Sequence, residues 1–439
     1  MGYNCRIRAG AKERRDQRVG VELNTTVLPV AKWLAVAFLA SVLFSHTNAL
    51  RFLLLLAGSC AVAVAAIRMR AGGKQDGLDL VPPALFAFLL WMAWAGASLA
   101  WSLEPELSQK EFTNELVYTL VAFWFCYLAG QAPGAARALG YGLGAALAAV
   151  CLIAGYEYFL DRGHYEFGLH GGAGNLTSAL ITLVPCLLLV CWLSREKAVS
   201  ARAGALAWVC VGLAVLGAYT TLNRTIWIAF IMQIFLAGAL ILWRSRDHRG
   251  LERRKLIGTA TAAALIAVAA AVTIAQVQQE RSELLRQRPG KEAAADPQND
   301  PRLRIWPYAV DIVRERPWLG MGYGRGIARK QLHDRFPERE IWHAHNLVLE
   351  TAIQVGIPGA VLLLALIGMT AVSGYRYARS RNAIRAACGI AVLCIVMGML
   401  LRNMTDVLWV RQNSLLYWGV IGMLFGVGRM HAGSGRGAQ

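Results

Sequence analysis

The chain has 439 residues, of which 56% are hydrophobic and only 16% charged, and its formal net charge is +18. Soluble globular chains are nearer half apolar and a quarter charged. The apolar residues here come in runs of about 18 or more, long enough to cross a hydrocarbon layer as helices. The composition therefore excludes a soluble enzyme, a disordered chain and a fibrous chain, and it indicates an all-α polytopic membrane protein.

The apolar runs predict about twelve transmembrane helices. Their expected ranges are 27–45, 50–67, 80–101, 115–130, 134–160, 176–193, 203–219, 225–243, 255–277, 346–372, 384–401 and 409–428. The first run lies too deep, and beside too many basic residues, to be a cleaved signal peptide. The chain is accordingly divided into a tail (1–26), nine helices (27–277), a long loop (278–345), three helices (346–428) and a second tail (429–439).

Lysine and arginine in the short loops predict the orientation. Cytoplasmic loops carry an excess of these residues, and basic loops alternate here with cation-poor ones along the whole chain. The basic group comprises the amino-terminal tail and residues 68–74, 137, 195–202, 244–255 and 376–385. We therefore expect both termini to be cytoplasmic and the long loop to lie on the outer side.

Two classes of site are disfavoured by the distribution of residues. Every cysteine except Cys5 lies inside an apolar run, where cysteine behaves as a small hydrophobic residue, so neither a disulfide framework nor a zinc site is indicated. The basic residues follow the membrane loops instead of forming one nucleic-acid-binding patch, so no nucleic acid partner is expected.

The long loop, residues 278–345, has two parts. Its start contains Gly290-Lys-Glu-Ala-Ala-Ala-Asp-Pro and is expected to be flexible. In its second half, apolar residues from Ile305 to Val313 recur at helical spacing, which predicts an amphipathic helix that ends at Pro317. A shorter helix is predicted between Ile327 and Arg335.

The segment Trp342-His343-Ala344-His345-Asn346 stands where the long loop re-enters the membrane. Histidine exchanges a proton near neutrality, so either imidazole is a candidate acid or base at the water boundary. The alternative interpretation is that both histidines are interfacial residues and that Asn346 caps the next helix. A metal site on the two histidines would need a third ligand, and none stands out. Glu350, one turn further on, costs energy in a span unless it is paired or faces water.

Arginines at two places are candidates for anion binding. Arg224 follows a very short outer connection, where its planar fork of donors would suit a phosphate; the alternative is a side chain that snorkels to the headgroups. Arg302 and Arg304 open the loop helix, where cations are unfavourable with respect to the helix dipole. This indicates an anionic partner, although a solvated basic face explains either arginine as well.

Two glycine-rich segments lie in outer loops. Gly320-Met-Gly-Tyr-Gly-Arg-Gly326 looks like a phosphate loop, but no predicted strand precedes it, so we interpret it as a flexible turn and expect no nucleotide. His170-Gly-Gly-Ala-Gly-Asn175 is the second such segment and could approach a ligand closely.

Four segments, taken in this order, resemble the O-antigen ligase and polymerase superfamily. They are Gly172–Asn175, the Thr-x-x-Asn-Arg stretch that ends at Arg224, residues 302–322, and the His-Asn block at 345–359. The resemblance covers about the last two thirds of the chain, and within the superfamily it is closest in character to the O-antigen ligases. The usual Ser-Arg of the family is Asn223-Arg224 here, so the arginine is kept.

The resemblance implies a GT-C type glycosyltransferase in the bacterial inner membrane with a periplasmic site. Its donor would be a polysaccharide on undecaprenyl pyrophosphate, and its acceptor a sugar hydroxyl of lipid A-core. His345 would be the general base, and Arg224 and Arg302 would hold the pyrophosphate. Since pyrophosphate is already an activated leaving group, no metal and no cofactor are implied. The other expected substrate-binding residues are His343, Asn346 and Arg304.

Two other functions remain open at this level. An O-antigen polymerase would use similar residues on lipid-linked repeats; the compact chain and the pronounced His-Asn block favour a ligase. A flippase or transporter of lipid-linked sugars would place polar groups near the bilayer midplane and often repeat its halves. The distinctive charges of this sequence cluster instead at the outer ends of the predicted helices.

Overall fold

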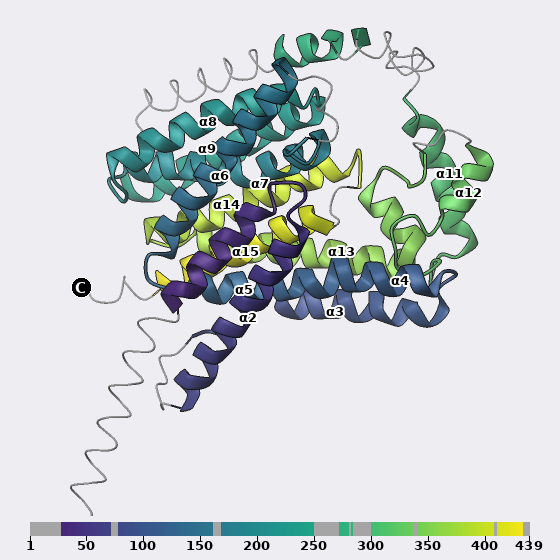
Figure 1. Cartoon of the computed structure of the whole chain (residues 1–439), viewed down its shortest axis with the longest axis horizontal. Coiled ribbons are helices and arrows are strands. Elements are labelled where there is room, and N and C mark those ends of the chain that lie inside the picture. The colour runs from purple at the N-terminus through teal and green to yellow at the C-terminus, as the bar shows by residue number, and fades with distance from the viewer. Residues whose placement is uncertain are drawn as a thin grey trace, which may run out of the picture.

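The computed structural model describes residues 28–71, 78–160, 168–249, 272–280, 282–283, 300–336, 341–407 and 411–432. Within these ranges the chain is largely helical, and most helices lie roughly along the long axis of the molecule (Figure 1). After the helix Leu28–Ser41, the first half contains α2 (Asn48–Ala71), α3 (Leu85–Ala97), the 3-10 turn Ser98–Trp101, α4 (Pro105–Glu111), α5 (Tyr118–Gly130), α6 (Ala135–Phe159), α7 (Ala173–Arg195), α8 (Ala201–Thr220) and α9 (Arg224–Arg249). The second half contains α11 (Arg302–Glu315), α12 (Arg329–Arg335), α13 (Leu347–Ala378), α14 (Ala383–Asn403) and α15 (Arg411–Met430).

Eight of the described helices are long and apolar enough to cross a membrane. Two shorter apolar helices, Leu28–Ser41 and Leu85–Trp101, fall where the first and third spans are predicted, and α15 occupies the predicted last span. Most of the predicted ninth span (255–271) and most of the two tails lie outside the described residues, and residues 272–277 of that span are helical. The all-helical, polytopic character is confirmed, whereas the number twelve stays a prediction.

The span predicted at 115–130 is longer than expected. The helix begins at Pro105 and runs without a break to Gly130, because proline suits the first helical turn and the polar residues that follow extend the helix beyond its apolar part. A π-helical segment, Phe112–Val117, interrupts its middle and carries Glu115. Such segments occur often at functional sites.

Hydrogen bonds join several basic connecting segments at one end of the bundle. The Arg429 side chain lies 3.0 Å from the Asp79 carboxylate, and Arg244 donates to the carbonyl of Arg381 at 2.7 Å. Most of the short loops that the sequence assigns to the cytoplasm therefore gather here, and we call this the basic end.

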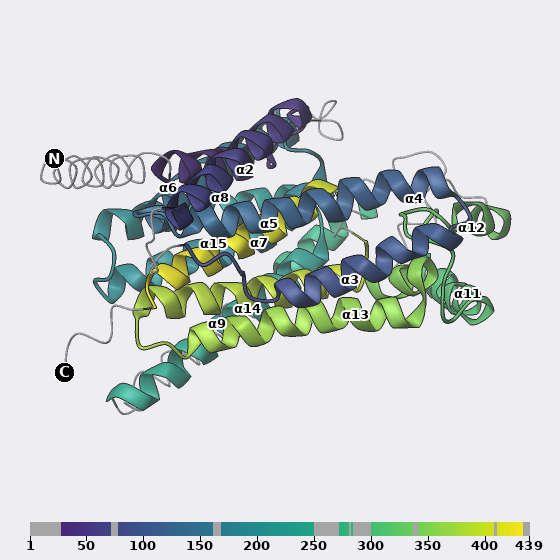
Figure 2. The same cartoon turned by 90° about the horizontal axis from the view of Figure 1, so that it is seen from below.

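The opposite end, which we call the loop end, carries α11 and α12 (Figure 2). Loops distant in sequence are tied together there. The buried Arg51 donates to the side chain of Gln412 at 2.9 Å, and Asn413 donates to Asn175 at 3.0 Å. The first turn of α15 is thereby held against the starts of α2 and α7.

Close contact between α5 and α15 forms the centre of the bundle. Gly422 and Gly426 face the carbonyl groups of Phe123 and Tyr127, and a Cβ atom at either glycine would lie within 2.5 Å of those oxygens. Small residues spaced four apart allow helix backbones to approach in this way inside a membrane. The packing explains why α15 is buried along nearly its whole length.

The two helices predicted in the long loop are confirmed as α11 and α12. Ile305, Ala309 and Ile312 are buried on one face of α11, as their spacing predicts. They form a small second core with Leu332 and Phe336 of the α12 region. This core holds the described residues 300–336 and 341–344 together at the loop end.

Candidate active site

A break in α13 anchors the outer loop to the membrane helices. Val355 and Gly356 are not helical, and Gly356 has a φ of 74°; a Cβ atom there would lie 2.3 Å from the carbonyl oxygen of Trp318. The carbonyl of Ile353 accepts from the Met321 amide at 2.9 Å. Backbone groups freed by the break are thus satisfied by the loop, as non-helical backbone at membrane depth requires.

The segment Gly320–Gly326 is therefore a structured turn and not a flexible one. Its Gly322 amide donates to the Gln354 carbonyl at 2.8 Å, and its Tyr323 hydroxyl donates to the Glu115 carboxylate at 3.0 Å. Burial, followed by the nearby Glu115 charge, raises the pKa of Tyr323 well above its usual value, so this hydroxyl stays a donor. The turn presents Arg325 to the neighbouring histidines.

His343 and His345 stack at the loop end with their ring centroids 3.9 Å apart. The backbone amide of His345 donates to Nδ1 of His343 at 3.0 Å, so the neutral His343 ring carries its proton on Nε2. His345 has a positive φ of 49°, which non-glycine residues adopt mainly where the surroundings impose it. The local backbone is thus arranged to bring the two rings together.

Asp406 is the carboxylate partner of this pair. It comes from the segment between α14 and α15, and its Oδ1 lies 3.4 Å from Nδ1 of His345 and 3.9 Å from Nε2 of His343. Arg402, in the last turn of α14, donates to Oδ2 at 3.2 Å. Asp406 therefore bridges His345 and a buried arginine.

The pKa values of this group separate the two histidines. Burial lowers the pKa of His343 to about 3, and the neighbouring His345 and Arg325 charges act in the same direction. Burial alone would raise the pKa of Asp406, but the hydrogen bond from His345 and the charge of Arg402 outweigh it and hold it well below the usual range. At neutral pH His343 is a neutral ring and Asp406 is charged.

The two histidines also differ in the exposure of their side chains. The His345 side chain is 25% exposed, whereas that of His343 is 3% exposed. Because Nδ1 of His345 faces the charged Asp406 at 3.4 Å, the proton of the neutral ring is favoured on Nδ1, which leaves Nε2 as its acceptor. His345 is thus the ring that a substrate hydroxyl could reach.

Arg325 is the cation nearest to the histidines. Its Nη2 lies 3.4 Å from Nε2 of His343, and its guanidinium stacks over the ring of Trp342 at 4.4 Å. Burial lowers the pKa of Arg325, while the carboxylates of Glu115 and Asp406 oppose that shift. Among the residues that the structure describes, its buried Nε atom has no hydrogen-bond partner.

The two arginines at the start of α11 point to different surroundings. Arg302 is half-buried, pairs with Asp300 at 3.0 Å, and its charge contributes to the low pKa of His343. Arg304 is exposed and lies 5.8 Å from the ring centroid of Phe336. Arg302 is therefore near enough for its charge to act on His343, whereas Arg304 lies on the surface.

Arg224 begins α9 at the loop end. Gln233 donates to the Cys394 carbonyl, and Arg244 donates to Arg381, so α9 and α14 run antiparallel. The nine residues from Gln233 back to Arg224 match the nine from Cys394 on to Asn403, which places Arg224 level with the last turn of α14. Arg224 thus lies at the level of the site, where Arg402 makes the contact with Asp406.

Asn346 caps α13, as the alternative interpretation of this segment expected for that residue. Its Oδ1 accepts from the amides of Val348 and Leu349 at 3.0 and 3.1 Å, and its Nδ2 donates to the Met404 carbonyl at 3.2 Å. Because both ends of this side chain are engaged, Asn346 connects the His345 loop to the segment that carries Asp406.

His343, His345 and Asp406 also have the composition of a metal site. One potential ligand atom from each lies within 4.8 Å of the others, and Asp406 is the third ligand that the sequence did not reveal. However, Arg325 faces Nε2 of His343 and Arg402 already holds Asp406. A divalent cation would have to compete with these guanidinium groups, so the donor set fits a metal poorly.

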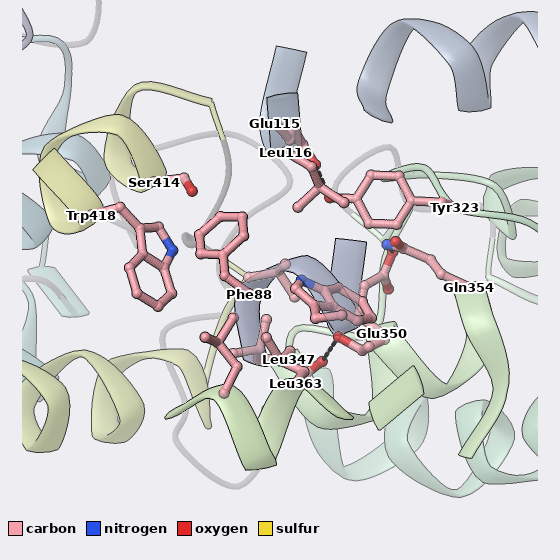
Figure 3. A pocket seen from close by; sticks show the side chains of 14 residues that line it. Phe88, Glu115, Leu116, Tyr323, Leu347, Glu350, Gln354, Leu363, Ser414 and Trp418 are labelled. Atoms are coloured by element: carbon pink, nitrogen blue, oxygen red, sulfur yellow. Dashed lines mark hydrogen bonds between the residues drawn. The ribbon is translucent and has the colours of Figure 1, made fainter. Parts of the chain in front are cut away.

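A small cavity lies beneath the histidine loop. It has a volume of about 50 Å³, which is room for a few water molecules and far below the ~300 Å³ or more of a ligand pocket. Figure 3 shows Tyr323, Gln354 and Glu350 on one side of it and Phe88 and Trp418 on the other. The cavity thus lies among polar and apolar residues that support the site, and it is too small for a sugar.

Three residues of the site did not follow from the sequence. Arg325 was visible in the glycine-rich turn but was not assigned a role. Arg402 lies in the last turn of α14 and Asp406 in the short connection that follows it, where charged residues at a helix end are unusual enough to have signalled a partner. The contact of Asp406 with His345 depends on the packing of α13 against α14, which local sequence does not reveal.

The geometry described above can be compared with known proteins. Residues 209–364 match a family model described as O-antigen ligase. The match spans Arg224, Arg302, Arg325 and both histidines, and ends before Asp406. It supports the superfamily that the sequence motifs resemble, and with it a transferase of lipid-linked polysaccharide, either a ligase or a polymerase. No curated protein matches the chain.

Proposed function

We propose that this protein is an O-antigen ligase of the GT-C type. It transfers a polysaccharide from undecaprenyl pyrophosphate to a sugar hydroxyl of lipid A-core. The single observation that carries the proposal is the His345–Asp406 pair, a partly exposed imidazole oriented by a carboxylate, which stands beside the arginines Arg325 and Arg302. A base and fixed cations are the two requirements for displacing a pyrophosphate with a hydroxyl.

His345 acts as the general base. Asp406 accepts from Nδ1, which leaves the lone pair of Nε2 for the acceptor hydroxyl, and it stabilises the imidazolium that forms. His343 cannot share this role near neutrality, because its pKa is about 3. Positioned bases of this kind typically contribute about 10²- to 10⁴-fold in rate.

The transfer is a single displacement with inversion. The acceptor oxygen forms a bond to the anomeric carbon while its proton moves to Nε2 of His345. The bond between that carbon and the phosphate oxygen breaks on the opposite side, and the lipid pyrophosphate leaves with the electron pair. The imidazolium then returns its proton to water, for which the exposure of His345 allows contact.

Arginines hold the pyrophosphate. Arg325 stands beside His343, Arg302 is near enough for its charge to act on that ring, and Arg224 reaches the same level from the start of α9. A guanidinium offers two parallel donors to phosphate oxygens, and fixed donors stabilise developing charge best where water is scarce. Arg304, which lies on the outer surface, would meet a substrate only at the edge of the site.

The mechanism needs no metal, because the arginines supply the positive charge. The expected result is that purified protein treated with EDTA and then desalted retains its transfer rate within about twofold. A rate that fell at least tenfold and returned with one divalent cation would assign His343, His345 and Asp406 to a metal instead.

The orientation follows from the two ends of the bundle. We infer that the basic end faces the cytoplasm, because cytoplasmic loops carry an excess of lysine and arginine. The loop end, the candidate site and its lipid substrates would then lie at the periplasmic face of a bacterial inner membrane. Reporter fusions test this: a reporter inserted between α11 and α12 should report the periplasm, and a cytoplasmic signal would contradict the proposal.

Reconstitution tests the function most directly. Purified protein in detergent, given a lipid-linked polysaccharide and lipid A-core, should form the linked product; detergent removes compartments, so product formation excludes pure transport. A deletion strain then separates ligase from polymerase. Loss of a ligase leaves long polymer unattached to lipid A-core, whereas loss of a polymerase leaves cores that carry a single repeat.

A further inference from the structure

Glu350 joins the two loops that carry the candidate base and its nearest arginine. Its Oε2 accepts from the backbone amide of Ala344 at 2.8 Å, and its Oε1 accepts from Nε2 of Gln354 at 3.1 Å. Oε1 of Gln354 in turn accepts from the Gly324 amide at 3.3 Å. One chain of hydrogen bonds therefore runs from the histidine loop to the glycine-rich turn.

The ends of this chain lie next to the functional residues. Ala344 stands between His343 and His345, and Gly324 directly precedes Arg325. Glu350 and Gln354 are themselves 2% and 7% exposed, so water does not compete for these bonds. Their loss would loosen both loops at once, because the same pair of side chains accepts from one backbone amide of each loop.

The position of Glu350 explains why a carboxylate is tolerated at membrane depth. It lies in the first turn of α13, where a negative charge is favoured by the helix dipole. A carboxylate has acceptor capacity at both oxygens, and both are used here. Gln354 serves as donor and acceptor together, so the direction of its amide is determined by its neighbours.

We propose that Glu350 and Gln354 are positioning residues that form a clamp between the histidine loop and the glycine-rich turn, and so set the place of His345 relative to Arg325. The inference rests on the proposed transferase function. Neither side chain is placed at the reacting atoms; they act through the backbone of the residues that are.

Glu350→Gln breaks the clamp in a defined way. If the new carbonyl accepts from Ala344, the new amide meets the amide of Gln354, donor against donor. Gln354 must then rotate, which takes its oxygen away from Gly324. An unsatisfied buried group costs enough to loosen a loop, so we expect kcat to fall about tenfold.

The double variant E350Q/Q354E restores every donor–acceptor pair and keeps the net charge. The carbonyl at 350 accepts from Ala344, the amide at 350 donates to the carboxylate at 354, and that carboxylate accepts from Gly324. We expect kcat to return to within about threefold of wild type. A merely structural role for a charge at 350 would not be rescued by moving the charge one turn along the helix.

Glu157→Gln is the matched control. Glu157 is also a buried carboxylate, 7% exposed, and it accepts from the Leu169 amide at 2.9 Å. The loop that it binds carries neither His345 nor Arg325. We expect its kcat within about twofold of wild type. An equal loss in this variant would overturn the proposal, because any buried carboxylate would then suffice.

Hydrogen exchange on the full-length protein in detergent tests the clamp without activity. Peptides covering 320–326 and 341–346 should exchange faster in Glu350→Gln, return in the double variant, and stay unchanged in Glu157→Gln. Unchanged exchange in Glu350→Gln, or faster exchange with an unaltered kcat, would overturn the proposal. A wild-type protein that does not transfer sugar would refute the proposed function, while the exchange result would still decide the clamp.

Discussion

Two histidine–carboxylate pairs lie at the loop end, one near the start of α7 and one before α13. In the first, Nδ1 of His170 contacts the Glu157 carboxylate, and the imidazole is completely buried. In the second, His345 faces Asp406 with a quarter of its side chain exposed, in a group that includes Arg325 and Arg402. The same two chemical groups therefore stand in opposite settings.

The contrast shows that a histidine and a carboxylate do not by themselves make a site. The His170 pair holds a loop: Glu157 also accepts from the Leu169 amide, and the Leu169 carbonyl accepts from Ser45. The His345 pair leaves one imidazole nitrogen accessible beside cations. Access and surrounding charge, which depend on tertiary packing, distinguish a candidate base from a structural residue.

Replacing the two histidines should give the largest difference. His345→Ala removes the base, so the transfer rate should fall about 10²- to 10⁴-fold, whereas His170→Gln should stay within about twofold. Initial rates of the reconstituted protein, at equal protein levels, measure this. Full-length capped lipopolysaccharide made at the normal rate by His345→Ala would remove His345 as the base.

Loss of the guanidinium fork should have the next largest effect. Arg325→Lys and Arg224→Lys keep the charge but lose bidentate donation, which should reduce kcat/KM for the lipid-linked donor about 10- to 100-fold. Arg314→Lys is the control, since Arg314 is exposed and pairs with Asp311. Donor titrations measure this, and wild-type values in both variants would show that charge alone is sufficient.

Removing the carboxylate of each pair should sharpen the contrast. Asp406→Asn takes away the carboxylate that orients His345 and stabilises the imidazolium, so the maximal rate should fall about tenfold. Glu157→Gln should stay within about twofold of wild type. Initial rates of the reconstituted protein measure both, and an unchanged rate in Asp406→Asn would indicate that Asp406 does not act through His345.

The smallest effect concerns stability. Burial lowers the pKa of His343 from its usual value of 6.5 to about 3 in the folded protein. Below pH 6.5 the unfolded chain therefore binds a proton at this residue that the folded protein does not bind. Stability is therefore lost as pH falls, by about 1 kcal/mol between pH 7 and 5.5. Thermal unfolding should show this, and His343→Gln should weaken the pH dependence; an identical dependence would contradict the burial argument.

The membrane helices and the approximate place of the site followed from the sequence. Hydrocarbon thickness sets the length of an apolar run, and the amphipathic spacing from Ile305 to Val313 determined α11 before packing was known. His343 and His345 stood out because few residues exchange protons near neutrality and these two precede a span. The length of an apolar run and the spacing of residues on a helix depend on residues close together in the chain, so both can be read from the sequence.

Tertiary structure decided which of these side chains meet and which of them are exposed. Asp406 is far from His345 in sequence and reaches it because α13 and α14 pack as neighbours; the same packing buries His343 and leaves His345 accessible. Arg302 and Arg304 are nearly adjacent in sequence, but α11 turns Arg302 toward the histidines and leaves Arg304 on the surface. Burial and long-range contacts arise from how helices pack, and no local pattern of residues encodes either.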